Sequence, residues 1–271
     1  MRNVNFSVII TTFNRSKKLL LALNSVLNQK HRPKEIIIIN NYQKKIQKKN
    51  LKCKNKNVIK IYNLKKNLHS ADGRNYGAQL SKNNFIAFLD DDDEWDSMYL
   101  YKANKIIQKK NTDVILTNLY YKNNKLKILK KVKDLNLQDC FVMNPGCMGS
   151  NLIINRGKFF KLGGFNKKFI PAEDRELLIR IIMNKLIINI SNSKVYYDVD
   201  SNDSISKKLN LILIGHTNLK NKYQNIIKTK NKFFINMKLN KILYKLSSGV
   251  IIKLIYLFLT FFYYIGFILL R

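Results

Sequence analysis

The residues best suited to chemistry form one acidic run, FLDDDDEWD, at positions 88–96. Six of the 17 acidic residues of the chain fall within seven consecutive positions here, in a protein with 50 Lys and Arg. Carboxylates this close repel one another unless water, a cation or a partner offsets their charge. Mg²⁺ or Mn²⁺ would offset it, because these ions bind carboxylate oxygens and share their other positions with water and substrate phosphates. The run therefore predicts a metal-bound diphosphate, with a hydrated loop that caps the next helix as the alternative.

Apolar segments and helical patterns alternate on both sides of this run. Continuous apolar segments predict buried strands at residues 8–12, 35–39, 58–62 and 85–89, the last directly before the acids. Helices are expected at 16–27, 73–81 and 97–109. Apolar strands separated by helices indicate an α/β fold with a mostly parallel, Rossmann-like central sheet flanked by helices. Ligands of such sheets bind beyond the carboxyl ends of the strands, which is where the acids lie.

The second half of the sequence is less regular. Strands are expected at 114–121, 125–132 and 150–154, followed by a short helix that ends at Gly163 and Gly164 and a helix over 173–184. From about residue 204 the sequence is helical and rich in Lys, and it closes with the apolar segment 249–271. We therefore expect a helical, partly hydrophobic C-terminal extension.

The net charge of +33 and the pI near 10.0 raise the possibility of nucleic-acid binding. However, the lysines lie in Lys-Asn-Ile-rich sequence without a helix-turn-helix, zinc-finger or aromatic RNA-binding signature. A solvated basic surface, or attraction to an anionic membrane, explains the charge as well. The three cysteines show no CxxC spacing, which fits a reducing compartment better than a disulfide framework or a zinc cluster.

Four stretches together resemble the family 2 glycosyltransferases of the GT-A fold. They occur in family order over residues 4 to about 185, and read VIITTFNRSKKLLLALNSVLNQKHRPKEIIIIN, GRNYG, FIAFLDDDDEWD and GGFNKKFIPAEDRELLIRI. The resemblance implies an inverting glycosyltransferase that uses a nucleotide sugar, expected to be a UDP-sugar, and a divalent cation, Mn²⁺ or Mg²⁺. It also implies a hydroxyl acceptor on a cell-surface glycan or a lipid-linked precursor, as in polysaccharide or lipopolysaccharide biosynthesis.

The resemblance assigns the nucleotide-sugar donor to the strand ends of the first half. Asp92 would be the main metal ligand, Asp90 would reach the ribose or the metal, and Asp93 would be a further ligand or hold a water. Glu94 and Asp96 are expected to be surface or capping acids. The positions expected to contact the donor are Thr11, Phe13, Arg15, Asn40, Asn41, Arg74, Asn75, Asp90, Asp91 and Asp92.

The acceptor side is expected in the second half. Asp174 would be the general base that takes the proton of the acceptor hydroxyl, with Glu173 as the second candidate. Acids at a helix N-terminus also stabilise the helix through its dipole, so a purely structural role is the alternative. The resemblance places Gly149, Ser150 and Asn151 beside the acceptor, and Trp95 would pack beside the sugar or in the core.

One pair departs from the family pattern. Family members carry two acids after the second strand, where this chain has Asn40 and Asn41. An amide still pairs with uracil, because its carbonyl accepts from N3–H and its NH₂ donates to O4. We expect donor binding to survive, and the selectivity for the base is the property that this change affects.

The apolar C-terminal segment suggests a membrane. Leu254 to Leu270 holds 17 uncharged residues, the lower limit for crossing a bilayer, and lysines stand before it. The alternatives are a spanning anchor, a helix that lies in the membrane interface, and a soluble core or oligomer helix. A membrane location would place the protein on the cytoplasmic face of the cell membrane, anchored or peripheral.

These observations combine into one domain scheme. We expect a GT-A domain over 1–200, with a donor half at 1–96 and an acceptor half at 97–200, then a basic helical extension at 201–248 and the membrane segment 249–271. The expected partners are the nucleotide-sugar donor, the glycan or lipid-linked acceptor and the membrane. The rival interpretation is a basic nucleic-acid-binding or scaffolding protein with an inert GT-A core.

Overall fold

A computed structural model describes residues 4–42, 44–51, 53, 56–64, 68–132, 135–199 and 208–270. The chain divides into two compact units. The first comprises residues 1–133, 146–165 and 184–201, and the second comprises 134–145, 166–183 and 202–271. The start of the expected basic extension, 201–207, lies outside the described residues.

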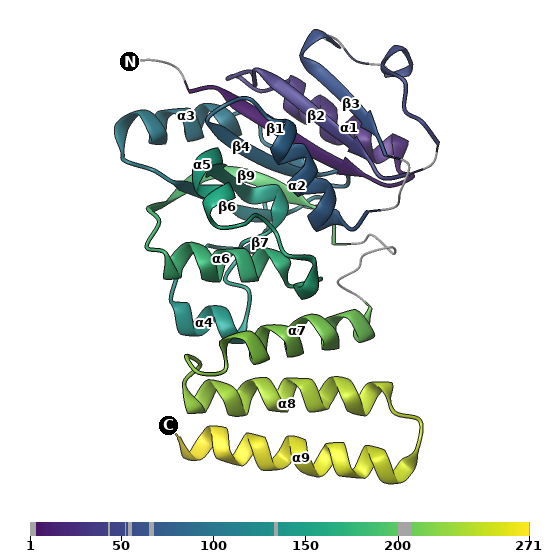
Figure 1. Ribbon diagram of the computed structural model, residues 1–271, viewed down its shortest axis with the longest axis vertical. Coiled ribbons are helices and arrows are strands. Elements are labelled where there is room, and N and C mark those ends of the chain that lie inside the picture. The colour runs from purple at the N-terminus through teal and green to yellow at the C-terminus, as the bar shows by residue number, and fades with distance from the viewer. Residues whose placement is uncertain are drawn as a thin grey trace. The chain divides into compact units, whose positions relative to one another are not determined.

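The first unit is built on a sheet in which nine described strands follow the order β3-β2-β1-β4-β8-β6-β9-β5, with β7 paired to β6 (Figure 1). The strands β1 to β4 are parallel and correspond to the four continuous apolar segments. Helices flank this part of the sheet, as expected. The bounds are β1 Phe6–Thr12, β2 Glu35–Asn40, β3 Ile59–Asn63 and β4 Phe85–Asp90, with α1 Ser16–Leu27, α2 Ser70–Leu80 and α3 Tyr99–Lys109 between and after them.

The register of these strands brings their carboxyl ends together. Thr12 of β1 is opposite Asn40 of β2, and Thr11 is opposite Asp90 of β4. Residues that are far apart in the sequence therefore meet at one edge of the sheet. This edge is the place that the α/β pattern predicted for a ligand.

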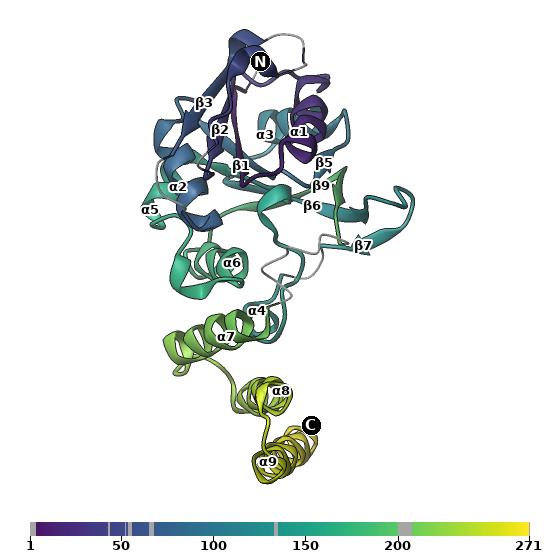
Figure 2. The same cartoon turned by 90° about the vertical axis from the view of Figure 1, so that its right-hand side faces the viewer.

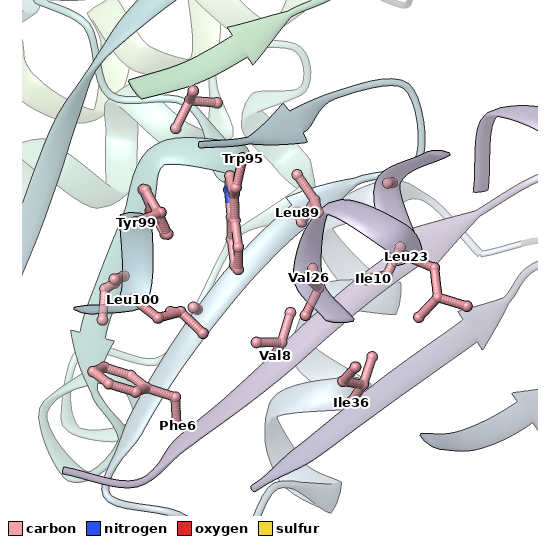
Figure 3. Packing of buried hydrophobic residues seen from close by; sticks show 14 of the residues in the cluster. Phe6, Val8, Ile10, Leu23, Val26, Ile36, Leu89, Trp95, Tyr99 and Leu100 are labelled. Atoms are coloured by element: carbon pink, nitrogen blue, oxygen red, sulfur yellow. The ribbon is translucent and has the colours of Figure 1, made fainter. Parts of the chain in front are cut away.

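Both faces of the parallel strands β1, β2 and β4 are buried, which explains their uninterrupted apolar runs. On one face, Val8 and Ile36 pack with Leu23 of α1 in a core that also includes Trp95 and Tyr99 (Figure 3). On the other face, α2 lies so close that a Cβ at Gly77 would collide with Ile9. Helix α2 therefore packs tightly enough to fix the residues at its N-terminal end.

The second half of the sheet contains antiparallel pairs. Strand β8 runs antiparallel between β4 and β6, and β6 and β9 are parallel. Strand β9 was not expected from the sequence, and the strand expected at 125–132 is reduced to β7. The bounds are β5 Glu94–Trp95, β6 Val114–Tyr121, β7 Ile128–Lys130, β8 Leu152–Asn155, β9 Ile188–Tyr197 and α5 Arg156–Lys161, with short 3₁₀ turns at Lys48–Asn50, Lys56–Val58 and Gly149–Asn151.

In its described part, the second unit is helical (Figure 2). It consists of α4 Leu137–Val142, the 3₁₀ turn Lys167–Phe169, α6 Glu173–Met183, α7 Leu209–Tyr223, α8 Thr229–Leu246 and α9 Val250–Leu269. The fully buried carboxylate of Glu176 accepts hydrogen bonds from Arg180, from Lys222 Nζ at 2.7 Å and from Tyr223 Oη at 2.9 Å. Helices α6 and α7 are therefore joined by one buried, fully partnered acid.

Candidate active site

The acidic run begins where β4 ends. Asp90 is the last residue of β4, and the chain then turns so that the backbone N–H of Asp93 donates to the carbonyl of Asp90. The short strand β5 follows and pairs with β9. Asp96 accepts from the backbone N–H of Met98 at 2.9 Å, directly before α3. The run thus contains a strand end, a turn and an acid at a helix start.

Arg74 holds the first acid of the run. Its Nη2 donates to both carboxylate oxygens of Asp90, at 2.7 and 2.8 Å. The Arg74 side chain is buried, and the ring of Phe165 lies 5.3 Å from its Cζ atom. Asn75 hydrogen bonds to both the backbone N–H and the carbonyl of Phe165. Asn75 therefore positions Arg74, the role expected for it from the resemblance, and it does so through Phe165, which was not expected.

Arg15 holds the second and third acids. Its Nη1 lies 2.7 Å from Asp92 Oδ2 and 3.3 Å from Asp91 Oδ1. The preceding residue, Asn14, adopts a φ of 52°, so the backbone turns sharply between β1 and α1. The hydroxyl of Thr12 donates to Asp91 at 2.6 Å. The loop after β1 therefore supplies both a charge and a hydroxyl to the acidic run.

Asp93 is the most deeply buried acid of the run. Its Oδ1 accepts from the backbone N–H of Asp198 at 2.9 Å, and Lys18 pairs with the Asp198 side chain at 2.8 Å. Lys122 lies beside the run as well, donating to the carbonyl of Asp92 and pairing with Glu94 at 3.1 Å. Asp198, Lys18 and Lys122 were not predicted, because they are distant in sequence and their residue types are common on surfaces.

The surroundings of the acids change their titration. Burial, more than any other cause, raises the pKa of Asp91 to about 6, against the hydrogen bond from Thr12. Burial and then repulsion from Asp90 raise the pKa of Asp92. Burial, followed by repulsion from Asp92 and Asp90, raises the pKa of Asp93 well above its usual range. The run is therefore a site where additional positive charge is favourable.

Two candidate donor residues are differently placed. The Phe13 ring is 45% exposed and meets Tyr42 edge-on at 5.2 Å. Thr11 is buried and packs its methyl group near Gly73 of α2. Phe13 is therefore an accessible aromatic surface at the end of β1, whereas Thr11 contributes to the packing beneath it.

The asparagine pair splits into two environments. The Asn40 amide donates to Asn63 and to the carbonyl of Lys44, and its oxygen accepts from the backbone N–H of Tyr42. Both amide hydrogens of Asn40 are thus used within the protein, and its expected contact with the donor stays a prediction. The oxygen of Asn41 is buried and lacks a hydrogen-bond partner among the described residues.

The turn Gly149–Asn151 is buried, and its expected place beside the acceptor stays a prediction. Ser150 Oγ accepts from the backbone N–H of Asp90 at 3.0 Å, and Asn151 Nδ2 donates to the carbonyls of Thr117 and Gly146. The turn packs against β4 and Arg74, so these residues help to hold the acidic run in place.

Trp95 likewise belongs to the core. It is 3% exposed, stacks on Tyr99 with ring centroids 4.3 Å apart, and donates from Nε1 to the carbonyl of Ser150 at 2.7 Å (Figure 3). Of the two roles that the sequence left open, packing in the core is the one observed. A tryptophan with its indole N–H satisfied inside the protein has no polar group left for a sugar.

The two candidate general bases lie in the second unit. Glu173 and Asp174 open α6, and Glu173 is buried whereas Asp174 is partly exposed. The acid run and the candidate bases thus belong to different units. Glu176, one turn further along the helix, is buried and fully partnered, so its role is structural.

The donor atoms of the run fit a hard divalent cation. Asp90 and Asp92 keep 27% and 18% of their side chains exposed, and both offer carboxylate oxygens. Among the described residues no three Asp, Glu, His or Cys side chains converge as a complete ligand set. Mg²⁺ and Mn²⁺ sites that use substrate phosphates need only one or two carboxylates, so Asp90 and Asp92 suffice chemically.

Comparison with known proteins decides the family. The family model described as glycosyl transferase family 2 matches residues 7–171, which is more than half of the chain. The chain belongs to this family. The match spans the strand ends, Arg74, the acidic run and the Gly-Gly-Phe segment that carried the resemblance.

Two curated relatives agree with this assignment. A Staphylococcus aureus protein, poly(ribitol-phosphate) beta-N-acetylglucosaminyltransferase TarP, is 27% identical over 216 residues, 74% of this chain and 65% of TarP. An uncharacterized glycosyltransferase of Rickettsia bellii is 38% identical over 94 residues, 34% of this chain. The chain spans 65% of the length of TarP and 14% of the Rickettsia protein.

Solved structures confirm the GT-A fold. The crystal structure of S. aureus TarS 1–349 in complex with UDP-GlcNAc matches with a TM-score of 0.62 at 17% identity, covering 89% of this chain and 85% of that chain. The same TarS fragment with UDP matches with a TM-score of 0.58. The solved structures thus agree with the family assignment, and the alternative of a nucleic-acid-binding or scaffolding protein with an inert GT-A core is not favoured.

Proposed function

We propose that this protein is a metal-dependent inverting glycosyltransferase that uses a UDP-sugar and a hydroxyl acceptor on a cell-surface glycan or lipid-linked precursor. The observation that carries the proposal is the run Asp90–Asp93 at the carboxyl end of β4, with Arg15 and Arg74 bonded to it. The binding of UDP-GlcNAc by TarS, whose fold this chain shares, supports the choice of donor.

The donor half supplies groups suited to a nucleoside diphosphate. The exposed ring of Phe13, next to Tyr42, offers a surface on which a base can stack. The Arg15 guanidinium is 24% exposed and can turn from Asp92 to a phosphate oxygen. Since the Asn40 amide is used within the protein, a contact between this segment and the base falls to Asn41.

The reaction is a single displacement. The acceptor oxygen forms a bond to the anomeric carbon of the sugar as the bond from that carbon to the diphosphate breaks, and the electron pair leaves with the diphosphate. Asp174 takes the proton of the acceptor hydroxyl, with Glu173 as the second candidate. A divalent cation held by Asp92, with Asp90 and Asp93 in support, would neutralise charge on the departing diphosphate.

The test measures UDP release from a panel of UDP-sugars in the presence of Mn²⁺. We expect Asp92→Asn to lower turnover of the preferred donor about a hundredfold, because one carboxylate charge at the leaving group is lost. Asp96→Asn is the matched control, since Asp96 lies in the same run but its carboxylate bonds to the backbone N–H of Met98. Equal activity of the two variants would refute the assigned role of Asp92.

A second pair of variants tests the base. If Asp174 accepts the proton, Asp174→Asn lowers kcat for transfer while the KM for the donor is unchanged. Glu173→Gln should then reduce kcat far less. The reverse order would transfer the role to Glu173, and no effect from either variant would exclude both residues as the base.

We further propose that the protein works at the cytoplasmic face of the cell membrane. Helix α9 is 20 residues long and largely apolar, with a mean hydropathy of 2.0, and by length and composition it could cross a bilayer. A membrane location would bring the site to a lipid-linked acceptor. How α9 meets the membrane is a separate question, which the packing of the second unit addresses.

A further inference from the structure

Helix α9 exposes apolar residues that a soluble protein would normally bury. Its outward surface is apolar, with Val250 74%, Phe258 68% and Leu269 79% exposed. The partly shielded stripe that faces α8 contains Lys253, Tyr256, Thr260, Tyr263 and Gly266, together with Leu259 and Phe267. A helix in water would turn its apolar face inward, so the surface of α9 is suited to a hydrocarbon environment.

Helix α9 is paired with α8 along its length (Figures 1 and 2). The ring of Phe234 packs on Phe267 at 5.2 Å, the ring of Phe233 on Tyr263 at 5.8 Å, and Lys253 lies over Tyr244 at 5.9 Å. Gly266 fits against the Phe233 ring, where a Cβ would collide. The two helices are thus antiparallel neighbours from one end to the other.

Helix α8 cannot share a transmembrane path with α9. It carries five lysines and three asparagines, and on its other side it bonds to α4 through Lys238 and Asn231. Lysines in the hydrocarbon centre of a bilayer are strongly unfavourable. If α9 crossed the bilayer with its α8 contacts intact, α8 would have to enter as well. The packing therefore excludes a spanning arrangement for the paired helices.

The charge around the hairpin selects the kind of membrane. From residue 204 to residue 271 the sequence has 11 Lys and one Arg but no Asp or Glu. Lys241 and Lys245 are exposed on α8. Lysines beside an apolar helix surface attract anionic headgroups while the apolar residues enter the acyl region.

We infer that α9 lies flat in one leaflet of an anionic membrane, with α8 as its polar cover, and does not cross the bilayer. This inference rests on the proposed membrane location and deepens it, but it is independent of the transferase activity. Its tests therefore measure lipid binding and the side of the membrane on which the ends of α9 lie. They can fail while the proposed reaction is confirmed, and they can succeed while the proposed reaction fails.

The first test is flotation of the full-length protein with phosphatidylcholine vesicles that contain about 30% phosphatidylglycerol. We expect binding at least about tenfold tighter than to phosphatidylcholine alone, and weaker in high salt. Phe258→Glu should weaken binding about tenfold or more, because a charge replaces an inserted ring. Leu126→Glu, at a residue 87% exposed on the first unit, is the matched control and should have no effect.

The lysines are tested in the same assay. The double variant Lys241→Glu, Lys245→Glu should lose about tenfold or more in binding to the anionic vesicles and nothing with the neutral ones. The matched control is Lys109→Glu, Lys161→Glu, since both lysines are exposed on the first unit. Equal losses in the two double variants would overturn the role of the hairpin, because they would show a general charge effect.

Sidedness separates the flat helix from a spanning one. In a Cys53→Ser background, Ser248→Cys and Leu270→Cys mark the two ends of α9 for a membrane-impermeant maleimide. A flat helix exposes both ends on the cytoplasmic side only. Labelling of Leu270→Cys from the opposite side would overturn the inference.

A second copy of the chain is the other possible cover for α9. In that case Phe258→Glu would convert a dimer to a monomer in analytical ultracentrifugation and would leave vesicle binding unchanged. This outcome would also overturn the inference. Circular dichroism of each variant checks that the helices persist, and Phe258 is exposed enough for the substitution to be accommodated.

Discussion

Replacing Gly149 by Ala should disturb the acidic run through Arg74. A Cβ at this position would lie 2.7 Å from both Cζ and Nη2 of Arg74. The guanidinium cannot move away freely, because it is buried, holds both oxygens of Asp90 and lies under the Phe165 ring. The methyl group therefore has to displace a side chain that is bonded on the opposite side.

The size of the effect follows from these distances. Ordinary van der Waals contact needs about 3.4–4 Å, so the guanidinium must shift by about 0.7 Å or more. A shift of this size weakens two charge-assisted hydrogen bonds of 2.7 and 2.8 Å. Each bond of this type contributes about 1.5–3 kcal/mol, and Asp90 is partly exposed, so we expect a loss of about 1–3 kcal/mol in the free energy of unfolding.

Urea denaturation measures this loss directly. Gly157→Ala is the matched control, because a Cβ there meets only Asn155 Oδ1 at 3.4 Å and the position lies in helix α5. The control should leave stability unchanged or raise it slightly, as alanine favours a helix over glycine. A UDP-release assay should also show a higher KM for the donor in Gly149→Ala alone.

An unchanged denaturation midpoint for Gly149→Ala would contradict this expectation. Such a result would mean that Arg74 relaxes without losing Asp90, and that the turn behind the acidic run does not constrain it. A loss of stability with an unchanged KM for the donor would show that the contact between Arg74 and Asp90 stabilises the fold but does not affect donor binding. Arg74 would then be a structural partner of Asp90 and not part of the donor site.

Three further predictions concern buried polar groups. Glu176→Ala should lower the free energy of unfolding by about 3–5 kcal/mol in urea denaturation, because it leaves Arg180 and Tyr223 without their buried acceptor, and a loss below about 1 kcal/mol would contradict this. Burial, followed by the charges of Arg175 and Lys238, lowers the pKa of His216 to about 4 from its ordinary 6.5. Between these two pH values the unfolded chain therefore binds a proton that the folded chain does not. The free energy of unfolding should fall as pH drops from about 6.5 to 4, by at most about 3 kcal/mol. In thermal melts over a pH series, His216→Gln should not show this fall. Trp95→Phe should cost about 1–3 kcal/mol of stability, because the indole bond to the Ser150 carbonyl is lost, while a transfer assay should give an unchanged KM for the acceptor.

The local pattern of the chain was enough to predict the strands that carry the donor site. The segments that became β1, β2 and β4 contain uninterrupted apolar runs because both faces of these strands are covered. The acidic run follows the last of them directly, so its place at a strand end was readable from one stretch of sequence. Residues linked by such short-range patterns need no knowledge of the fold to be found.

Residues that reach the site from distant parts of the sequence could not be predicted in this way. Strand β9, Asp198 and Lys122 reach the site only because β9 pairs with β5 and β6. Their sequences alternate polar and apolar residues on a partly exposed strand, a weak signal beside the continuous apolar strands.

The sequence alone determined the kind of chemistry and the family motifs, since residue type and spacing decide which groups follow each strand. Which of these groups remain available depends on contacts made in the folded protein. The tertiary structure engages the Asn40 amide, buries Trp95 and Asn151 as supports, and pairs the acids with Arg15 and Arg74. In the same way, composition identifies α9 as apolar, but its pairing with α8 shows which face is outward. The physical reason is that burial and hydrogen-bond satisfaction depend on neighbours that are remote in the chain.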